Sequence, residues 1–146
     1  MKRHQQNGLT LIELMVVISI VAILASIAYP AYSSFVRQAN RTDATKTMQL
    51  AAQSLERCYS RRFSYAACNV NGTVMNNGST MTTPNLFYTI RFAIPDAQDY
   101  TLTAVPALAP QTGDRQCVQF TISSTGAQAA QDSHGTNTTK TCWGSN

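Results

Sequence analysis

Glu13 is the residue of this sequence whose charge most needs a partner. It is the only acidic residue among the first 42 positions, and a long apolar run follows it directly. A carboxylate at the centre of a bilayer costs roughly 2.5 to 3.5 kcal/mol, so Glu13 needs a positive partner. If the chain is cut after Gly8, the new α-amine of Leu9 carries a positive charge four residues before Glu13. That amine could neutralise Glu13 within one chain, or the amine of a neighbouring chain could do so in an assembly.

The four cysteines, all beyond the apolar run, are the next reactive groups. They are Cys58, Cys68, Cys117 and Cys142. An even number of cysteines behind an export signal predicts two disulfides in an oxidising compartment, each stabilising the fold by about 2 to 4 kcal/mol. The count alone leaves three connectivities open. We expect no metal site, because there is no CxxC pair and His134 is the only histidine after His4.

A group of arginines is interleaved with aromatic residues: Arg57, Tyr59, Arg61, Arg62, Phe63 and Tyr65. Arginines bind phosphates and exposed aromatic rings stack on bases, so Arg57, Arg61 and Arg62 are candidates for DNA contact. The alternative is a solvated helix end, where the helix dipole favours positive charge. The sequence favours this alternative, and DNA is the less favoured partner.

The sequence contains no recognisable set of catalytic residues. His134 lies in a polar Gly/Ser/Thr segment, and the sequence places no second catalytic group beside it. No GxGxxG string, Walker motif or HExxH motif occurs. We therefore expect neither enzyme activity nor a cofactor.

The elements that position these residues begin with the apolar run. The chain has 146 residues, enough for one domain, and only 12% of them are charged. Residues 14–36 hold no charged residue or histidine, and Lys2, Arg3 and His4 precede them. This excludes a purely cytosolic globular domain and a disordered chain. A secretory signal cleaved near Ser26-Ile27-Ala28, a simple membrane anchor and a retained assembly helix remain open.

Apolar residues continue beyond Pro30 at spacings of three or four, which predicts an amphipathic helix. Joined to the apolar run, it makes one helix of about 50 residues that ends near Cys58. The first half is apolar on all sides, as an assembly stem requires, and the second half has one stripe for packing on its own domain. Pro30 lacks a backbone donor, so we expect a bend or a local break there.

The remainder of the chain predicts a small antiparallel sheet laid across the helix, hence an α+β fold. Apolar residues alternate with polar ones over residues 88–94, 100–104 and 118–122. Residues 69–85 are rich in Asn, Gly, Thr and Ser and predict a loop of about 17 residues. Residues 127–146 carry few large apolar side chains, so a disulfide must hold them.

The string GLTLIEL at residues 8–14, the apolar run and Tyr29-Pro30-Ala31-Tyr32 resemble the class III signal of type IV pilins. The usual first mature residue in that family is Phe, where this chain has Leu9. The strings Thr141-Cys142-Trp143 and 100–104 resemble PilE-type pilins, which include minor subunits.

The resemblance assigns a role to each matching residue. It implies that residues 1–8 are a leader removed by the prepilin peptidase after Gly8, and that Leu9 becomes N-methylated. Glu13 would serve methylation and subunit docking, and Pro30 would belong to a segment that loses helicity in the filament. Because a disulfide ties the C-terminal D-region of pilins to the sheet, Cys117 is expected to pair with Cys142 and Cys58 with Cys68.

The implied fold is that of a type IV pilin. Residues 9–36 would be the hydrophobic transmembrane and assembly helix, and residues 37–146 the globular head. The head would contain the second half of the helix, an αβ-loop at 59–85, a sheet at about 86–123 and a disulfide-tied D-region at about 117–142.

The implied function is that of a major or minor type IV pilus subunit. It would wait in the bacterial inner membrane as a single-pass protein and polymerise with other pilin subunits, through the inner-membrane assembly machinery, into a retractile surface filament. Adhesion, twitching motility and DNA uptake are the associated activities. The alternatives are a DNA-binding competence pilin and a type II secretion pseudopilin. The second is disfavoured because Asp132 is the only acidic residue in 116–146, too few for a calcium-binding loop.

Overall fold

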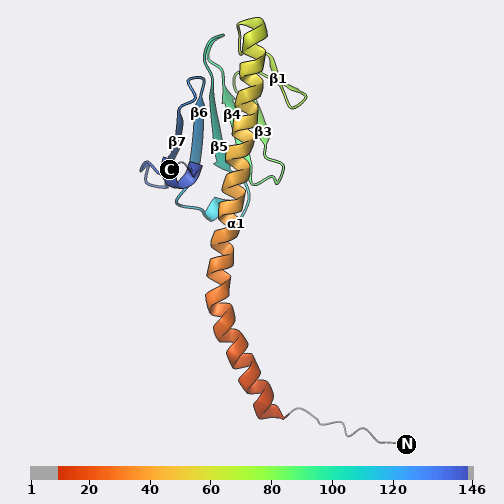
Figure 1. Cartoon of the computed structure of the whole chain (residues 1–146), viewed down its shortest axis with the longest axis vertical. Coiled ribbons are helices and arrows are strands. Elements are labelled where there is room, and N and C mark those ends of the chain that lie inside the picture. The colour runs from red at the N-terminus through yellow and green to blue at the C-terminus, as the bar shows by residue number, and fades with distance from the viewer. Residues whose placement is uncertain (1–9, 145–146) are drawn as a thin grey trace, which may run out of the picture. The chain divides into compact units, whose positions relative to one another are not determined.

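The computed structural model describes residues 10–144, which divide into two compact units, one ending at Val36 and the other beginning at Arg37. Helix α1 (Leu11–Arg62) has 52 residues and contributes to both units (Figure 1). The predicted long helix is thereby confirmed. Gly8 and Leu9 lie outside the described residues.

Helix α1 passes Pro30 without interruption, so the expected local break is not found. The proline ring removes only one N–H donor, and the backbone on both sides keeps its helical bonding. Nearby hydroxyls also bond to the backbone of their own helix: Ser26 Oγ donates to the carbonyl of Ile23 at 2.7 Å, and Ser34 Oγ to that of Ala31 at 2.8 Å. A helix already formed on both sides tolerates one missing bond.

The end of α1 corrects a second expectation. The helix does not stop at Cys58 but continues to Arg62. Nothing in the side chain of Cys58 breaks a helix. The break comes at Phe63, whose backbone takes a left-handed φ of 52° while its N–H still donates to the carbonyl of Tyr59 at 2.7 Å. The irregular segment therefore begins at Phe63.

The sheet of the second unit has five antiparallel strands in the order of the chain, β3 to β7. Residues of the three central strands pair in a continuous register, with Ile90 opposite Ala104 and Ala104 opposite Phe120. The predicted antiparallel sheet and the α+β class are confirmed. The strands are β3 (Thr80–Thr82), β4 (Tyr88–Ala93), β5 (Thr101–Pro106), β6 (Gln119–Ser123) and β7 (Gln128–Gln131).

The segment 69–85, expected to be one loop, holds strands instead. Strands β1 (Cys68–Val70) and β2 (Thr73–Met75) form a separate hairpin, and β3 follows. Asn71 and Gly72 both have positive φ, at 51° and 83°, which is the geometry of a tight two-residue hairpin turn. The polar turn residues were recognised, but the short strands between them carry too few apolar side chains to stand out.

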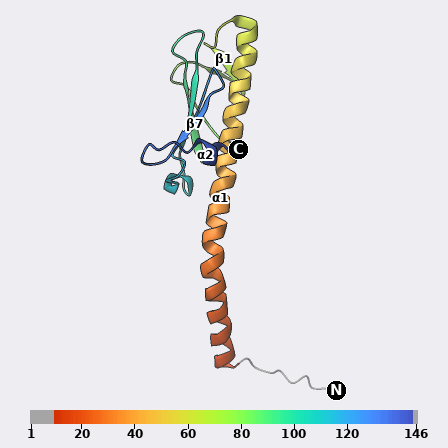
Figure 2. The same cartoon turned by 60° about the vertical axis from the view of Figure 1, so that its left-hand side comes forward.

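The core lies between α1 and the inner face of the sheet. Figures 1 and 2 show the strands running along one side of the C-terminal part of α1. Alternate residues of β4 and β5 point inward and are fully buried, as the two-residue period requires. Helix α1 contributes Ala44, Met48, Ala51, Ala52 and Leu55, and the sheet contributes Tyr88, Ile90, Phe92, Leu102, Ala104, Phe120, Ile122 and Ala130.

Two polar residues of α1 are buried where the apolar stripe was expected to continue. Asn40 and Arg41 are buried, whereas Phe35 is exposed. The Arg41 guanidinium donates to both carboxylate oxygens of Asp114, at 2.6 and 2.7 Å. Asn40 donates to Gln111 Oε1 at 3.2 Å, and these bonds fasten the segment around Gln111–Gly113 to the helix.

Both disulfides join pairs that the resemblance implies: Cys58 with Cys68, and Cys117 with Cys142. The second bridge holds helix α2 (Thr139–Trp143) beside β6 and β7. The backbone N–H of Thr138 donates to the carbonyl of Ala130 at 2.9 Å, so the tail also covers the outer edge of β7. Because β7 ends at Gln131, the sheet extends further along the chain than the expected limit near residue 123.

The Arg41–Asp114 pair predicts a large stability effect. Replacing Asp114 by Asn should lower the free energy of unfolding by about 3 kcal/mol, because it leaves the buried guanidinium without its carboxylate. Denaturation of the full chain in non-ionic detergent, followed by the fluorescence of Trp143, measures this. Arg115→Gln, at an exposed neighbouring position, is the control and should change stability by less than about 0.5 kcal/mol. Equal stability of both variants would contradict the role of the pair.

Candidate functional site

Glu13 lies in the first turn of α1. Its backbone N–H donates to Thr10 Oγ1 at 3.3 Å, and that of Leu14 donates to the Thr10 carbonyl at 3.2 Å. Thr10 thus caps the helix, and Thr10 to Glu13 has the spacing of a capping box, a signal that the sequence analysis missed. The carboxylate stands where the helix dipole already favours negative charge.

The first part of α1, residues 11–36, is called the stem here, and it presents apolar side chains to the outside. Its large apolar side chains are exposed on every side, from 49% at Val17 to 76% at Tyr29. Its serine hydroxyls donate to carbonyls of the same helix, as Ser19 Oγ does to Met15 at 2.8 Å. A helix with satisfied polar groups and an apolar surface on all sides suits lipid or a bundle of helices. By length and composition α1 is able to cross a membrane.

The three arginines near the end of α1 lie together. Arg57, Arg61 and Arg62 are exposed and line one surface hollow of about 480 Å³. Arg57 donates to Ser54 Oγ at 3.0 Å, and Arg62 Nη1 donates to the carbonyl of Ala67 at 3.0 Å. The hollow is completed by Ser54, Cys58, Ala67, Asn69 and Asn71.

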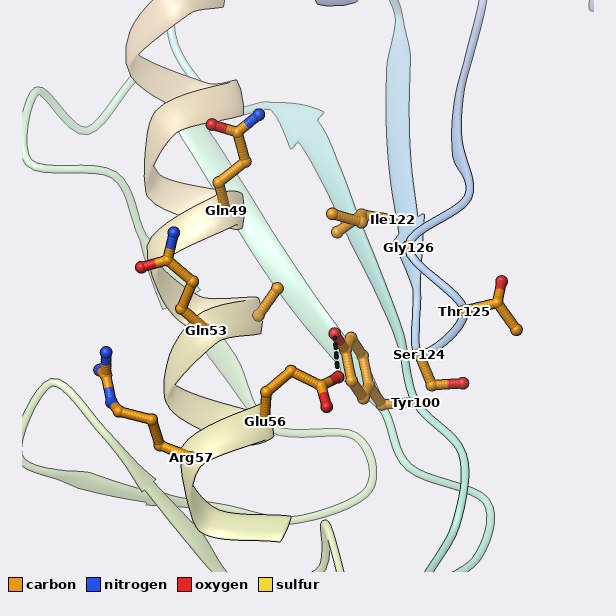
Figure 3. A pocket seen from close by; sticks show the side chains of 10 residues that line it. Gln49, Gln53, Glu56, Arg57, Tyr100, Ile122, Ser124, Thr125 and Gly126 are labelled. Atoms are coloured by element: carbon orange, nitrogen blue, oxygen red, sulfur yellow. Dashed lines mark hydrogen bonds between the residues drawn. The ribbon is translucent and has the colours of Figure 1, made fainter. Parts of the chain in front are cut away.

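Among the described residues, no carboxylate lies within 4.0 Å of these three arginines. Glu56 is their neighbour in sequence but accepts hydrogen bonds from the hydroxyls of Tyr65 and Tyr100, each at 3.0 Å. Figure 3 shows Glu56 turned toward Tyr100 while Arg57 leaves the helix in another direction. The positive charge of the hollow is therefore free to meet an anion.

Burial and the neighbouring Glu56 together raise the pKa values of Tyr65 and Tyr100. Burial, followed by the hydrogen bond to Glu56, raises the pKa of Tyr65 to about 12. The same causes raise the pKa of Tyr100 well above its usual range. Both phenols stay protonated and keep donating to Glu56 at physiological pH, so this carboxylate is held in place beside the sheet.

His134 is exposed and lies near Asp132. The backbone N–H groups of Thr136 and His134 donate to Asp132 and lower the pKa of its carboxyl, and these bonds shape the turn around it. In the part of the chain that the structure describes, no three His, Cys, Asp or Glu side chains gather as a metal site would require.

Comparison with known proteins identifies the family to which this chain belongs. Residues 30–121, more than half of the chain, match the family described as "Type IV minor pilin ComP, DNA uptake sequence receptor". The chain belongs to the ComP family of type IV minor pilins. Residues 3–29 also match the prokaryotic N-terminal methylation motif, which spans Gly8 and Glu13. For a ComP-family chain, the type IV pilin is favoured over the type II secretion pseudopilin.

Two relatives of this ComP-family chain have names that refer to the prepilin peptidase or to the type IV pilus. It is 48% identical over 54 residues to the "Prepilin peptidase-dependent protein D" of Escherichia coli (strain K12), over 37% of each chain. It is 44% identical over 69 residues to "Type IV pilus subunit protein TapA" of Aeromonas hydrophila, over 47% of this chain and 48% of TapA. The chain thus spans less than half the length of either relative. The TapA match agrees with the two family matches, which together identify the chain as a type IV pilin.

The tyrosine pair predicts a pH effect. The folded-state pKa values of Tyr65 and Tyr100 are raised, so their contribution to stability is complete below about pH 10 and is lost as the pH rises further. Glu56→Gln removes the negative charge and should let both phenols ionise at lower pH, though burial keeps their pKa values raised. Absorbance at 295 nm against pH measures this.

The matched control for this titration is Asp43→Asn, which removes a carboxylate 13 residues earlier on α1 and should leave the tyrosine titration unchanged. If the titration curve of Glu56→Gln coincides with that of the wild type, burial alone raises the pKa values of the two tyrosines and Glu56 does not contribute.

Proposed function

We propose that this minor pilin is stored in the inner membrane as a single-pass protein, enters a type IV pilus through its apolar stem, and binds DNA with the arginine hollow at the end of α1. The observation that carries the DNA-binding part is the convergence of Arg57, Arg61 and Arg62 on one hollow with no facing carboxylate among the described residues. The family description supports the same ligand.

The stem supports the assembly part of the proposal. Its exposed apolar surface requires lipid before assembly and the helices of other pilin subunits afterwards. Cleavage by the prepilin peptidase after Gly8 would leave the α-amine of Leu9 as the positive partner of Glu13, from the same chain or from a neighbour in the filament. The pilus assembly machinery of the inner membrane would move the stem from one environment to the other.

The DNA part rests on local charge rather than on total charge. Residues 37–146 contain nine basic and six acidic side chains, a small excess for a DNA-binding domain. Three of the nine basic groups line the hollow, together with Asn69 and Asn71. Guanidinium groups and amides are the donors that phosphate oxygens accept from. This surface supports DNA binding. The sequence had favoured the alternative, in which the arginines form only a solvated helix end.

The assembly role predicts a clear loss for a change at Glu13. Glu13→Gln should give a protein that is exported and cleaved but absent from filaments, because the stem can no longer pair with an amine. The measurement compares sheared surface filaments with the membrane fraction by immunoblot, and intact mass reports cleavage and methylation. Glu13→Asp keeps the charge and serves as the control. Normal incorporation of the Gln variant would refute the pairing.

The DNA role predicts a salt-dependent effect. Replacing Arg57, Arg61 and Arg62 by Gln should weaken DNA binding by the full chain in non-ionic detergent at least tenfold. The slope of log K against log salt concentration should fall in magnitude by about 2 to 3, one counterion step for each lost phosphate contact. Fluorescence anisotropy with labelled DNA at several salt concentrations measures both quantities.

A charge-matched control separates the hollow from general basicity. Arg91, Arg115 and Lys140 are exposed at other places in the head, and replacing these three by Gln removes the same charge. The proposal requires this control to bind DNA like the wild type. It is overturned if both triple variants lose the same affinity, or if the wild type shows no salt-sensitive binding.

A further inference from the structure

A second surface hollow, here called the apolar groove, adjoins the arginine hollow. It has a volume of about 730 Å³, and its lining comes from α1, from the end of β1, and from β3 with the segment that follows it. Ser54, Arg57 and Asn71 line both hollows, so the two share a border. A phosphate bound at Arg57 therefore lies beside the opening of the apolar groove.

The apolar groove differs in character from the arginine hollow. Among the described residues that line it, Arg57 is the only charged one. Leu50 of α1 and Leu86, which lies between β3 and β4, are each 54% exposed and line the groove from different elements. Half of the lining residues are apolar: Leu50, Ala51, Val70, Met81, Pro84 and Leu86. The groove thus offers apolar surface to a ligand directly beside a positive charge.

The two adjoining hollows together indicate the kind of ligand. A ligand that fills both must carry an anionic group beside an apolar one. A nucleotide has this composition, because one sugar joins its phosphate to a flat base. Proteins that take a base out of the helical stack hold it between apolar or aromatic side chains. A small inorganic anion would occupy the arginine hollow alone, and an uncharged apolar molecule would occupy the groove alone.

We propose that the apolar groove receives one unpaired base of the DNA whose phosphates are bound by the arginine hollow. This inference rests on the proposed DNA-binding function and adds a structural preference to it. The bases of a closed duplex are paired and stacked, so a base must leave the stack before it can enter the groove. A duplex that already contains one unpaired nucleotide is spared this cost and binds more tightly.

The test uses the full chain in non-ionic detergent and two duplexes that differ at one bulged position, which carries thymine in one and an abasic sugar in the other. Both duplexes have the same number of phosphates, so the arginines bind them equally. The wild type should bind the thymine bulge about 5- to 10-fold more tightly, as burial of roughly 40 to 55 Å² of apolar surface gives. Fluorescence anisotropy with labelled duplexes measures both affinities.

Two variants change the apolar walls without touching the core. Leu50→Gln and Leu86→Asn should each abolish the preference for the thymine bulge. Gln is a good helix former, and Asn tolerates the left-handed φ of 62° at position 86, so both variants should keep the Tm of the wild type. Leu108→Gln is the matched control, since Leu108 is 50% exposed and does not line the groove. It should keep the full preference.

Photo-cross-linking locates the base directly. With 5-iodouracil in place of the bulged thymine, we expect the cross-linked peptide, identified by mass spectrometry, to contain Leu50, Met81 or Leu86. A cross-link confined to residues outside the groove would contradict the inference even if the preference for the thymine bulge were found.

The outcomes keep this inference apart from the function on which it rests. Salt-sensitive DNA binding with equal affinity for the two bulged duplexes overturns the groove inference alone. The same holds if the preference survives in both leucine variants, or if Leu108→Gln also loses it. The variant with Arg57, Arg61 and Arg62 replaced should weaken both duplexes alike. Absence of any salt-sensitive DNA binding by the wild type overturns the proposed DNA-binding function itself.

Discussion

The head of this pilin depends on the packing of one stripe of α1 against one face of the sheet. Met48 and Leu55 are fully buried, and they share the core with inward-facing residues of the strands, such as Phe92. A single contact layer needs only one side of the helix. The other sides of the same turns remain available, and there α1 carries Arg57, Arg61 and Arg62. The helix that stabilises the head thereby also presents its most basic surface.

The sequence predicts the elements whose signal lies in neighbouring residues, and it misses features that depend on short strands or on distant residues. Strands β4, β5 and β6 follow from alternation along the chain, and the pilin family follows from the string around Glu13. Strands β1, β2, β3 and β7 were missed because they have three or four residues each and little apolar contrast. The burial of Arg41 could not be predicted, because its reason is Asp114, 73 positions later.

The candidate DNA surface shows a similar limit. The sequence located the arginines, but it could not tell whether Glu56 neutralises them. The structure answers this through Tyr65 and Tyr100, which hold the carboxylate on another side of the helix. The left-handed backbone of Phe63 has no sequence signal, since the position carries neither Gly nor Asn. Charges and types of residues are local information, whereas their directions depend on the completed fold.

The tail that covers the outer edge of β7 closes a strand edge that would otherwise be open. An uncovered strand edge pairs readily with other chains. Here the edge is closed by a segment with few large apolar residues, and the Cys117–Cys142 bridge keeps that segment in place. The bridge thus protects the sheet from other chains: without it the tail would be free to leave β7, and the backbone groups of that strand would be open to pairing.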